Sequence, residues 1–307
     1  MTSATAFDLD AYLADQGVAV EGALRRAMDD DMLASSLPAD VAPALRHGVL
    51  TGGKRLRPIL CVTAWQAVGG GGKGPAAVYD LAASLELIHA YSLVHDDLPC
   101  MDDAALRRGA PTTHRVHGER AAVRAGAALI PCAALLALRA CGALGCPSGR
   151  AVAVVRVLME AAGAGGMVGG QWLDLLGEGQ ALDGPALDRL HARKTGALLT
   201  ASLVMGALAA GADAGVVAGL RTYGEAVGLA FQIADDVLDA TASADVLGKN
   251  PSDATLDKST YVSLYGLDEA RARARAQVDR ALAALADGGV RAPALEALAA
   301  YVVERDR

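Results

Sequence analysis

Long segments rich in Ala, Leu, Arg and Glu recur along this chain of 307 residues, with apolar positions at helical spacing. Few segments show the alternation of apolar and polar residues that marks a half-buried strand. A chain of this size forms one large domain or two. The pattern predicts an all-α fold, and we expect a single domain over residues 1–307.

The charge balance and the cysteines exclude several classes of function. The formal net charge is −7, and no stretch resembles a basic face that could neutralise a nucleic acid. The five cysteines are odd in number and contain no C-x-x-C pair, so they predict neither a disulfide framework nor a zinc site. The first residues, MTSATAFDLDAYLADQ, lack the basic-then-apolar pattern of a signal peptide. We expect a cytoplasmic protein without a nucleic-acid partner.

One stretch approaches the length of a membrane span. Thr195 to Ala212 carries no charge over 18 residues, which is near the lower limit for a spanning helix. It contains Gly, Ala, Ser and Thr as often as Leu, and Lys194 and Asp213 bracket it closely. We expect a buried helix in a helical core and no membrane span.

The stretch Glu86–Gly109 (ELIHAYSLVHDDLPCMDDAALRRG) combines an apolar helix with a cluster of acids. Pro99 should end the helix, because it lacks an N–H group and its ring clashes one turn back. The acids at this boundary are Asp96, Asp97, Asp102 and Asp103. Such acids could be solvated or could cap the next helix, but a divalent cation would also hold them together, and Mg²⁺ commonly joins carboxylates to substrate phosphates. Arg107 and Arg108 follow at once, and guanidinium groups suit phosphate oxygens.

A second acidic cluster lies far along the chain, in FQIADDVLD. Asp235 and Asp239 are four residues apart, so both carboxylates leave the same face of a helix, which Gln232 shares and Asp236 borders. Like charges at this spacing destabilise a helix, so this cluster also calls for a cation. A di-metal carboxylate bundle is excluded, because such bundles need two E-x-x-H pairs and Glu86–His89 has no second.

Basic residues recur at positions suited to phosphate. In TGGKRLRP, Lys54, Arg55 and Arg57 stand at the start of a helix, where free N–H groups favour an anion. Lys194 and Thr195 open the uncharged helix, and Lys249 and Lys258 follow the second acidic cluster. A phosphate ester with an apolar tail fits these surroundings.

Taken together, the segments GGKRLRP, DDLPCMD, LRRG, KTG, FQIADDVLD, LGK and DKSTY resemble the trans-isoprenyl diphosphate synthase family, and within it the bacterial farnesyl diphosphate synthase type. The resemblance runs from about Thr51 to the end of the chain. It implies an isoprenoid-synthase helical bundle around a central cavity, and a homodimer. It also implies isopentenyl diphosphate and an allylic diphosphate as substrates.

The resemblance implies a role for each motif residue. Three Mg²⁺ ions would bridge the diphosphate to two facing aspartate motifs, Asp96, Asp97 and Asp102, and Asp235, Asp236 and Asp239. Isopentenyl diphosphate would be held by Lys54, Arg57, His89 and Arg108. The allylic diphosphate would be contacted by Arg107, Lys194, Lys249 and Lys258. Thr195 and Gln232 would line the reacting end.

The same resemblance suggests the product. Tyr91 and Ser92 lie about one turn before Asp96 and would form the floor of the cavity. A Tyr ring at that depth leaves no room for a fourth isoprene unit, which predicts farnesyl diphosphate, with geranyl or geranylgeranyl diphosphate as alternatives. Tyr91 could instead simply pack between helices, and the opposite wall or a partner subunit could set the depth.

Several positions depart from the family's pattern. Ala104 and Ala105 stand where relatives often have two further Asp, Ala127 stands where Asp is usual, and His117 stands where a Phe commonly precedes Gly-Glu. They leave open an inactive subunit of a heteromeric synthase. A terpene cyclase is the other alternative, but its second metal motif is normally of the Asn/Ser/Glu type and it does not need the GGKRLRP segment.

Overall fold

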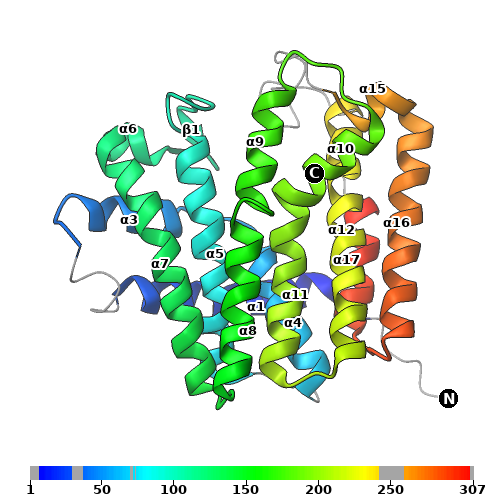
Figure 1. Ribbon diagram of the computed structural model, residues 1–307, viewed down its shortest axis with the longest axis horizontal. Coiled ribbons are helices and arrows are strands. Elements are labelled where there is room, and N and C mark those ends of the chain that lie inside the picture. The colour runs from blue at the N-terminus through cyan, green and yellow to red at the C-terminus, as the bar shows by residue number, and fades with distance from the viewer. Residues whose placement is uncertain (1–6, 30–36, 70–71, 73, 242–258, 305–307) are drawn as a thin grey trace. The chain divides into compact units, whose positions relative to one another are not determined.

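The computed structural model describes residues 7–29, 37–69, 72, 74–241 and 259–304, and helices make up almost all of their regular structure (Figure 1). The predicted all-α class is therefore confirmed. The chain divides into two compact units. We call Asp10–Leu158 with Leu208–Gly211 the N-terminal unit, and Met1–Leu9, Met159–Ala207 and Ala212–Arg307 the C-terminal unit. The single domain stays a prediction.

The N-terminal unit is built on one core helix. Its elements are α1 (Leu9–Asp29), α3 (Val41–Leu50), α4 (Leu56–Gly69), α5 (Ala76–Asp96), β1 (Leu106–Arg107), β2 (Ala110–Pro111), α6 (Thr113–His117), α7 (Glu119–Ala143) and most of α8 (Ser148–Ala162). Helix α5 packs against α3, α4 and α7. Leu81, Leu85, Leu87 and Ile88 are fully enclosed, as a helix that is apolar on all sides requires.

The end of α5 fixes the first acidic cluster. The helix stops at Asp96, and the N–H of Asp97 donates to the carbonyl of Leu93 at 3.0 Å. Pro99 explains the stop, because a proline disfavours helical backbone in the residue before it. The buried helix α5 thus fixes the positions of Asp96 and Asp97 at its C-terminal end.

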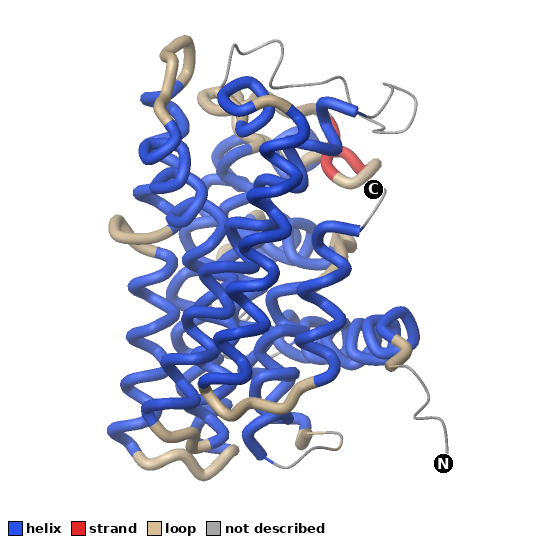
Figure 2. The backbone as a smooth tube through the Cα atoms, turned by 90° about the vertical axis from the view of Figure 1, so that its right-hand side faces the viewer, coloured by secondary structure: helices blue, strands red, loops and turns tan. Residues whose placement is uncertain are grey.

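A short hairpin, which the sequence analysis did not predict, follows the first acidic cluster (red in Figure 2). Strands β1 and β2 pair antiparallel, with Leu106 opposite Pro111 and Arg107 opposite Ala110. The two turn residues, Arg108 and Gly109, have φ angles of 54° and 77°. A two-residue hairpin turn with positive φ at both positions matches the right-handed twist of its strands.

The C-terminal unit holds the second acidic cluster. Its elements are α9 (Met167–Gly177), α10 (Gly184–His191), the π-helical turn η1 (Ala192–Gly196), most of α11 (Ala197–Ala210), α12 (Ala214–Thr241), α15 (Tyr261–Tyr265), α16 (Leu267–Asp287) and α17 (Pro293–Glu304). Helices α12 and α16 lie side by side (Figure 1). Leu187, Ile233, Tyr261, Ala270 and Ala274 form a buried cluster.

The uncharged stretch forms η1 and α11, and Leu203, Val204 and Met205 on α11 have no exposed surface. Its interpretation as a buried helix is confirmed. Two other stretches, Glu119–Ala143 and Ser148–Gly177, are long and apolar enough to span a membrane, by length and composition alone. Half (50%) of the apolar window of the first and 39% of the second is buried. The second consists of α8 and α9 with a break at residues 163–166.

Candidate active site

The C-terminal unit contains a cavity of about 350 Å³, which we call the acidic cavity. Its lining comprises Asp174, Gly177, Leu182, Leu187, Leu190, His191, Lys194, Gln232, Asp235, Asp236, Asp239, Ser259 and Thr260. Helix α12 turns the buried residues Ala230, Ile233 and Ala234 inward. The three acids near its C-terminal end, Asp235, Asp236 and Asp239, line the cavity, and the helical spacing had placed Asp235 and Asp239 on one face.

The basic side of the acidic cavity comes from η1. Lys194 Nζ donates to Asp174 Oδ2 over 2.5 Å, and these side chains are 31% and 14% exposed. The close approach of α9 to η1 depends on Gly170, because a Cβ there would lie 2.1 Å from the backbone nitrogen of Lys194. Asp174, one turn further along α9, thereby reaches Lys194. Single π-helical turns are rare in proteins, and those that occur often lie at functional sites.

A chain of hydrogen bonds joins η1 to α12. Thr195 Oγ1 donates to Gln232 Oε1 at 3.2 Å, and Gln232 Nε2 donates to Asp235 Oδ2 at 3.4 Å. The structure therefore brings the sequence-predicted residues Lys194, Gln232 and Asp235 to one cavity, and Thr195 is bonded to Gln232 next to it. Lys249 and Lys258 lie outside the described residues.

His191 lines the same cavity and was missed by the sequence analysis. Both of its ring nitrogens are buried, and neither has a hydrogen-bond partner within the part of the chain that the structure describes. Burial lowers the pKa of His191 to about 4, against the opposing effects of Gln232 and Asp174. The sequence feature that could have identified His191 is its position three residues before Lys194, on the same helical face.

In the N-terminal unit, the first acidic cluster meets the hairpin. Arg107 donates to Asp97 Oδ1 from Nη2 at 2.6 Å and from Nε at 3.0 Å. The Asp97 side chain is 5% exposed. The N–H of Asp102 donates to the carbonyl of Asp96 at 2.9 Å, which folds the run back on itself. Asp97 as a metal ligand and Arg107 as a diphosphate contact both stay predictions.

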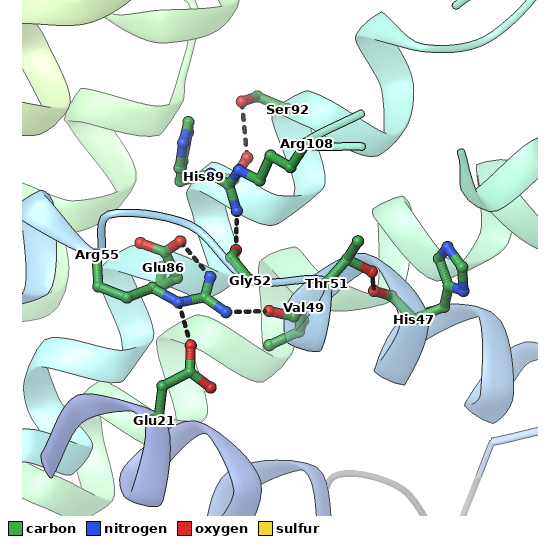
Figure 3. Close-up of polar contacts among 10 residues, drawn as sticks. All are labelled: Glu21, His47, Val49, Thr51, Gly52, Arg55, Glu86, His89, Ser92 and Arg108. Atoms are coloured by element: carbon green, nitrogen blue, oxygen red, sulfur yellow. Dashed lines mark hydrogen bonds and ion pairs between the residues drawn. The ribbon is translucent and has the colours of Figure 1, made fainter. Parts of the chain in front are cut away.

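Arg55 departs from the anion site that the sequence suggested for Lys54, Arg55 and Arg57. Its guanidinium turns inward and donates to Glu86 at 2.6 Å, to Glu21 at 2.7 Å and to the carbonyl of Val49 at 2.9 Å (Figure 3). Its backbone has a φ of 52°. The buried carboxylate of Glu86 needs a cation, so Arg55 is held in the core.

Three predicted residues gather near the GGKRLRP loop and form what we call the cationic site: Arg57, His89 and Arg108. Arg108 donates to the carbonyl of Gly52 (Figure 3). Its guanidinium occupies the space that a Cβ on Gly53 would take, at 2.3 Å. Residue 53 also has a φ of 132°, which favours glycine.

The electrostatics of the cationic site favour an anion. Burial holds the pKa of His89 well below its ordinary value, and the nearby charges of Arg57 and Arg108 lower it further. Burial also lowers the pKa of Arg57, opposed by Glu86. Arg57 Nε is buried and has no hydrogen-bond partner among the described residues. An anion would satisfy this donor. Lys54 is exposed on the same loop.

Backbone strain marks the same region. The non-glycine residues with positive φ in the described part of the chain are Arg55, Asp103 and Arg108. Left-handed backbone costs about 1–2 kcal/mol for such residues, and strain of this kind clusters at functional sites. Here it directs Arg55 inward and presents Arg108 to the cationic site.

The predicted floor residues lie on α5. Tyr91 is half-buried and packs edge-on against His95, with ring centroids 5.0 Å apart and an interplanar angle of 79°. Burial, and then the charge of Asp96, raises the pKa of Tyr91. Ser92 Oγ donates to the carbonyl of His89 at 2.9 Å. The ring of Tyr91 therefore has a fixed neighbour, while its role as a floor stays a prediction.

The positions that depart from the family's pattern have ordinary contacts. Thr112 bonds to the carbonyls of Ala104 at 2.8 Å and Ala105 at 3.1 Å, so this segment is held through its backbone. His117 packs edge-on against His47, with centroids 5.2 Å apart. Ala127 is exposed on α7.

The donor set of the acidic cavity fits Mg²⁺ that shares its ligands with a phosphate. Mg²⁺ prefers oxygen ligands, keeps several waters and takes one or two carboxylates beside substrate phosphates. Asp235, Asp236 and Asp239 supply such oxygens in one cavity. The described residues contain no group of three His, Cys, Asp or Glu close enough to hold an ion by themselves. Whether the two aspartate motifs face each other stays a prediction.

Comparison with known proteins identifies the class. The family described as Polyprenyl synthetase matches residues 39–292. Farnesyl diphosphate synthase of Escherichia coli is 43% identical over 276 residues, covering 87% of this chain and 90% of that protein. A chloroplastic geranylgeranyl pyrophosphate synthase of Catharanthus roseus is 39% identical over 308 residues, covering 99% and 84%.

Among solved structures, a geranyltransferase from Legionella pneumophila superposes with a TM-score of 0.83 at 31% identity, covering 97% of both chains. The fold and the matches define an all-α prenyltransferase. The chain belongs to the polyprenyl synthetase family. It is a trans-prenyl diphosphate synthase, and the substrates of the family are isopentenyl and allylic diphosphates.

Proposed function

We propose that this enzyme condenses isopentenyl diphosphate with dimethylallyl and then geranyl diphosphate, in the presence of Mg²⁺, to give mainly farnesyl diphosphate. The observation that carries the assignment of the allylic site is the acidic cavity, where Lys194 lies with three carboxylates of α12. Magnesium, when bound, supplies the positive charge that neutralises the leaving diphosphate.

The two sites divide the substrates between them. The acidic cavity takes the allylic diphosphate through Asp235, Asp236 and Asp239, with Lys194 as a cationic contact. The cationic site takes isopentenyl diphosphate, because it offers, next to Arg108, the buried Nε donor of Arg57, which no other described residue pairs. The neutral imidazole of His89 adds a hydrogen-bonding group there without further charge.

The proposed reaction breaks one C–O bond and forms one C–C bond. As the C1–O bond of the allylic substrate breaks, its electron pair goes to the diphosphate, whose growing charge Lys194 stabilises without reorganisation. The double bond of isopentenyl diphosphate attacks C1. A proton leaves the new unit and goes to the departed diphosphate. Apolar residues such as Leu187 and Leu190 help to exclude water, which would quench the allylic cation.

Tyr91 supports farnesyl diphosphate as the product. It lies five residues before Asp96, about 7 Å along the axis of α5, and His95 packs against its ring. A chain that extends from Asp96 along α5 would meet this ring. Relatives of similar identity bear the names of farnesyl and of geranylgeranyl synthases, so geranylgeranyl and geranyl diphosphate are the competing products.

We also propose a homodimer that works in the cytoplasm without a membrane span. Val123, Leu135 and Leu138 on α7 are 45%, 45% and 48% exposed. Exposed apolar residues on one helix suit an interface with a second copy. Light scattering during size-exclusion chromatography should give twice the chain mass of 31.1 kDa, whereas membrane insertion would make the protein depend on detergent.

One incubation tests the proposed product. The enzyme is mixed with Mg²⁺, dimethylallyl diphosphate and isopentenyl diphosphate, and the dephosphorylated products are separated by chain length. We expect fifteen carbons as the main product. A main product of ten or twenty carbons would reject the product assignment, and no condensation at all would favour an inactive subunit.

A further inference from the structure

Tyr261 bonds to two different elements of the C-terminal unit. Its backbone N–H donates to Asp236 Oδ2 at 2.6 Å, and its Oη donates to Asp188 Oδ1 at 2.5 Å. The residue opens α15 and is 1% exposed. Hydrogen bonds to carboxylates are shorter and stronger than those between neutral groups. Tyr261 is therefore tethered at both its backbone and its side chain.

The two partners of Tyr261 lie on different helices, and one of them, Asp236, lines the acidic cavity. Asp236 lies on α12, within the acidic run. Asp188 lies on α10, which continues directly into η1, so Lys194 follows six residues later in the same helical segment. One tyrosine thus connects the helix that carries the acids with the helix that carries the cation.

The surroundings of Tyr261 leave its ring little freedom. The ring stacks on His191, with centroids 5.7 Å apart and planes at 29°, and on Tyr265, at 6.4 Å and 23°. Its backbone is fixed by a capping box, in which Thr260 Oγ1 accepts from the N–H of Ser263 and Ser263 Oγ accepts from the N–H of Thr260. These contacts hold the ring in one orientation, in which its hydroxyl bonds to Asp188.

We propose that Tyr261 is a positioning residue that sets the spacing between Lys194 and the carboxylates of α12. This inference rests on the proposed function, in which the acidic cavity holds the allylic diphosphate. A diphosphate must contact the acids, through Mg²⁺, and Lys194 at the same time. A small shift of α10 against α12 would therefore weaken both contacts. Displacements of about 1 Å can cost about 100-fold in rate.

The chain offers a matched pair of variants. Tyr261→Phe removes the hydroxyl, while the stacking and the backbone bond to Asp236 remain. Tyr223→Phe is the control, because Tyr223 is 0% exposed, lies on α12 and donates to the carbonyl of Leu295 at 2.7 Å, away from the acidic cavity. Both variants lose one buried hydroxyl bond, so both should lower the melting temperature, and Tyr261→Phe should lower it more because its bond is to a carboxylate.

The two variants should differ in substrate affinity. Tyr261→Phe should raise the KM of the allylic diphosphate about 10-fold, with the KM of isopentenyl diphosphate within about twofold of the wild type. Tyr223→Phe should change neither KM. Asp188→Leu should repeat the effect of Tyr261→Phe, and the double variant should be no worse than either single one, since both remove the same bond. Equal KM values in Tyr261→Phe and Tyr223→Phe would overturn the inference.

A binding measurement separates this inference from the proposed function. Calorimetry with inorganic diphosphate and Mg²⁺ is run on the wild type and on Tyr261→Phe. If the wild type binds and Tyr261→Phe binds about 10-fold more weakly, the inference is supported. If both bind equally, the inference fails while the proposed site stands. If the wild type does not bind, the proposed site itself fails, and the inference with it.

Discussion

Arg55 and Glu86 form an ion pair inside the N-terminal unit, with Nη1 2.6 Å from Oε1 and each side chain 2% exposed. Glu21 bonds to the same guanidinium at 2.7 Å. This arrangement links α1, α5 and the loop before α4. A buried pair of this kind is hard to break from one side, because the remaining charge has no partner. Arg55 therefore has an architectural role, although it stands among substrate-binding residues in the sequence.

The first prediction follows from this pair. Arg55→Ala should lower the free energy of unfolding by about 3–5 kcal/mol, since Glu86 stays buried without its ion-pair partner. The matched control is Arg115→Ala, which removes a pair with Asp103 whose side chains are 49% and 57% exposed. Its loss should stay below about 1 kcal/mol. Urea titrations measure both, and similar losses in the two variants would contradict the architectural role of Arg55.

The second prediction concerns the pH dependence of stability. The pKa of His191 is lowered to about 4 in the folded protein, whereas in the unfolded chain it is about 6.5. Between these values the unfolded state binds the proton and the folded state does not. Stability from this group is complete above pH 6.5 and falls as the pH drops towards 4, by at most about 1.4 kcal/mol per pH unit.

His191→Phe tests this dependence, because the ring still stacks on Tyr261 but cannot titrate. Unfolding free energies of both proteins are compared at pH 7 and pH 4.5. The difference between the two pH values should be smaller in the variant. An identical difference would show that other groups cause the loss of stability in acid.

The third prediction addresses the acids. Asp96→Ala and Asp235→Ala should each reduce turnover by about 100- to 1000-fold or more, because each removes an oxygen that helps to neutralise the leaving group. Neither change should unfold the protein, since the loss of an acid relieves repulsion between neighbouring carboxylates. Near-normal turnover of Asp235→Ala at saturating Mg²⁺ would rule out the proposed role of the acidic cavity.

The fourth prediction separates the two substrates. Arg57→Ala and His89→Ala should raise the KM of isopentenyl diphosphate about 10- to 100-fold, which corresponds to one lost bond to a charged group. The KM of the allylic substrate should change much less. Initial rates with one substrate varied and the other saturating give both values. Equal changes for both substrates would mean that a single pocket takes both diphosphates.

Much of the fold was predictable because apolar residues at helical spacing mark the helices in the sequence. The uncharged stretch after Lys194 and the stop at Pro99 both gave correct elements, since burial and the missing N–H group act locally. The hairpin at Leu106–Pro111 was not predicted. Its turn places Arg108 in left-handed backbone. Hairpin turns of this type favour Asn, Asp or Gly at that position, so an arginine there gives no signal of a turn.

The site was predictable in part for a related reason. Asp235, Asp239 and Gln232 share a face through helical spacing alone. By contrast, the inward turn of Arg55 depends on Glu21 and Glu86, which are 34 and 31 residues away. The places of His191 and Tyr261 at the site depend on the packing of α10, α12 and α15 against one another, which the sequence does not show. Contacts between distant segments carry no local signature in the sequence.

The fifth prediction concerns Tyr91 and is the central claim about the product. Tyr91→Ala removes the ring that lies about 7 Å before Asp96 along α5, and the cavity should then admit a longer chain. Tyr91→Phe is the matched control, because it keeps the ring and loses only the hydroxyl. Its main product should stay at fifteen carbons.

The most direct measurement is the chain length of the products of the wild type, Tyr91→Phe and Tyr91→Ala, made side by side from dimethylallyl and isopentenyl diphosphates with Mg²⁺. We predict fifteen carbons for the wild type and Tyr91→Phe, and twenty or more for Tyr91→Ala. The same product distribution from all three proteins would contradict the account and place the floor of the cavity elsewhere.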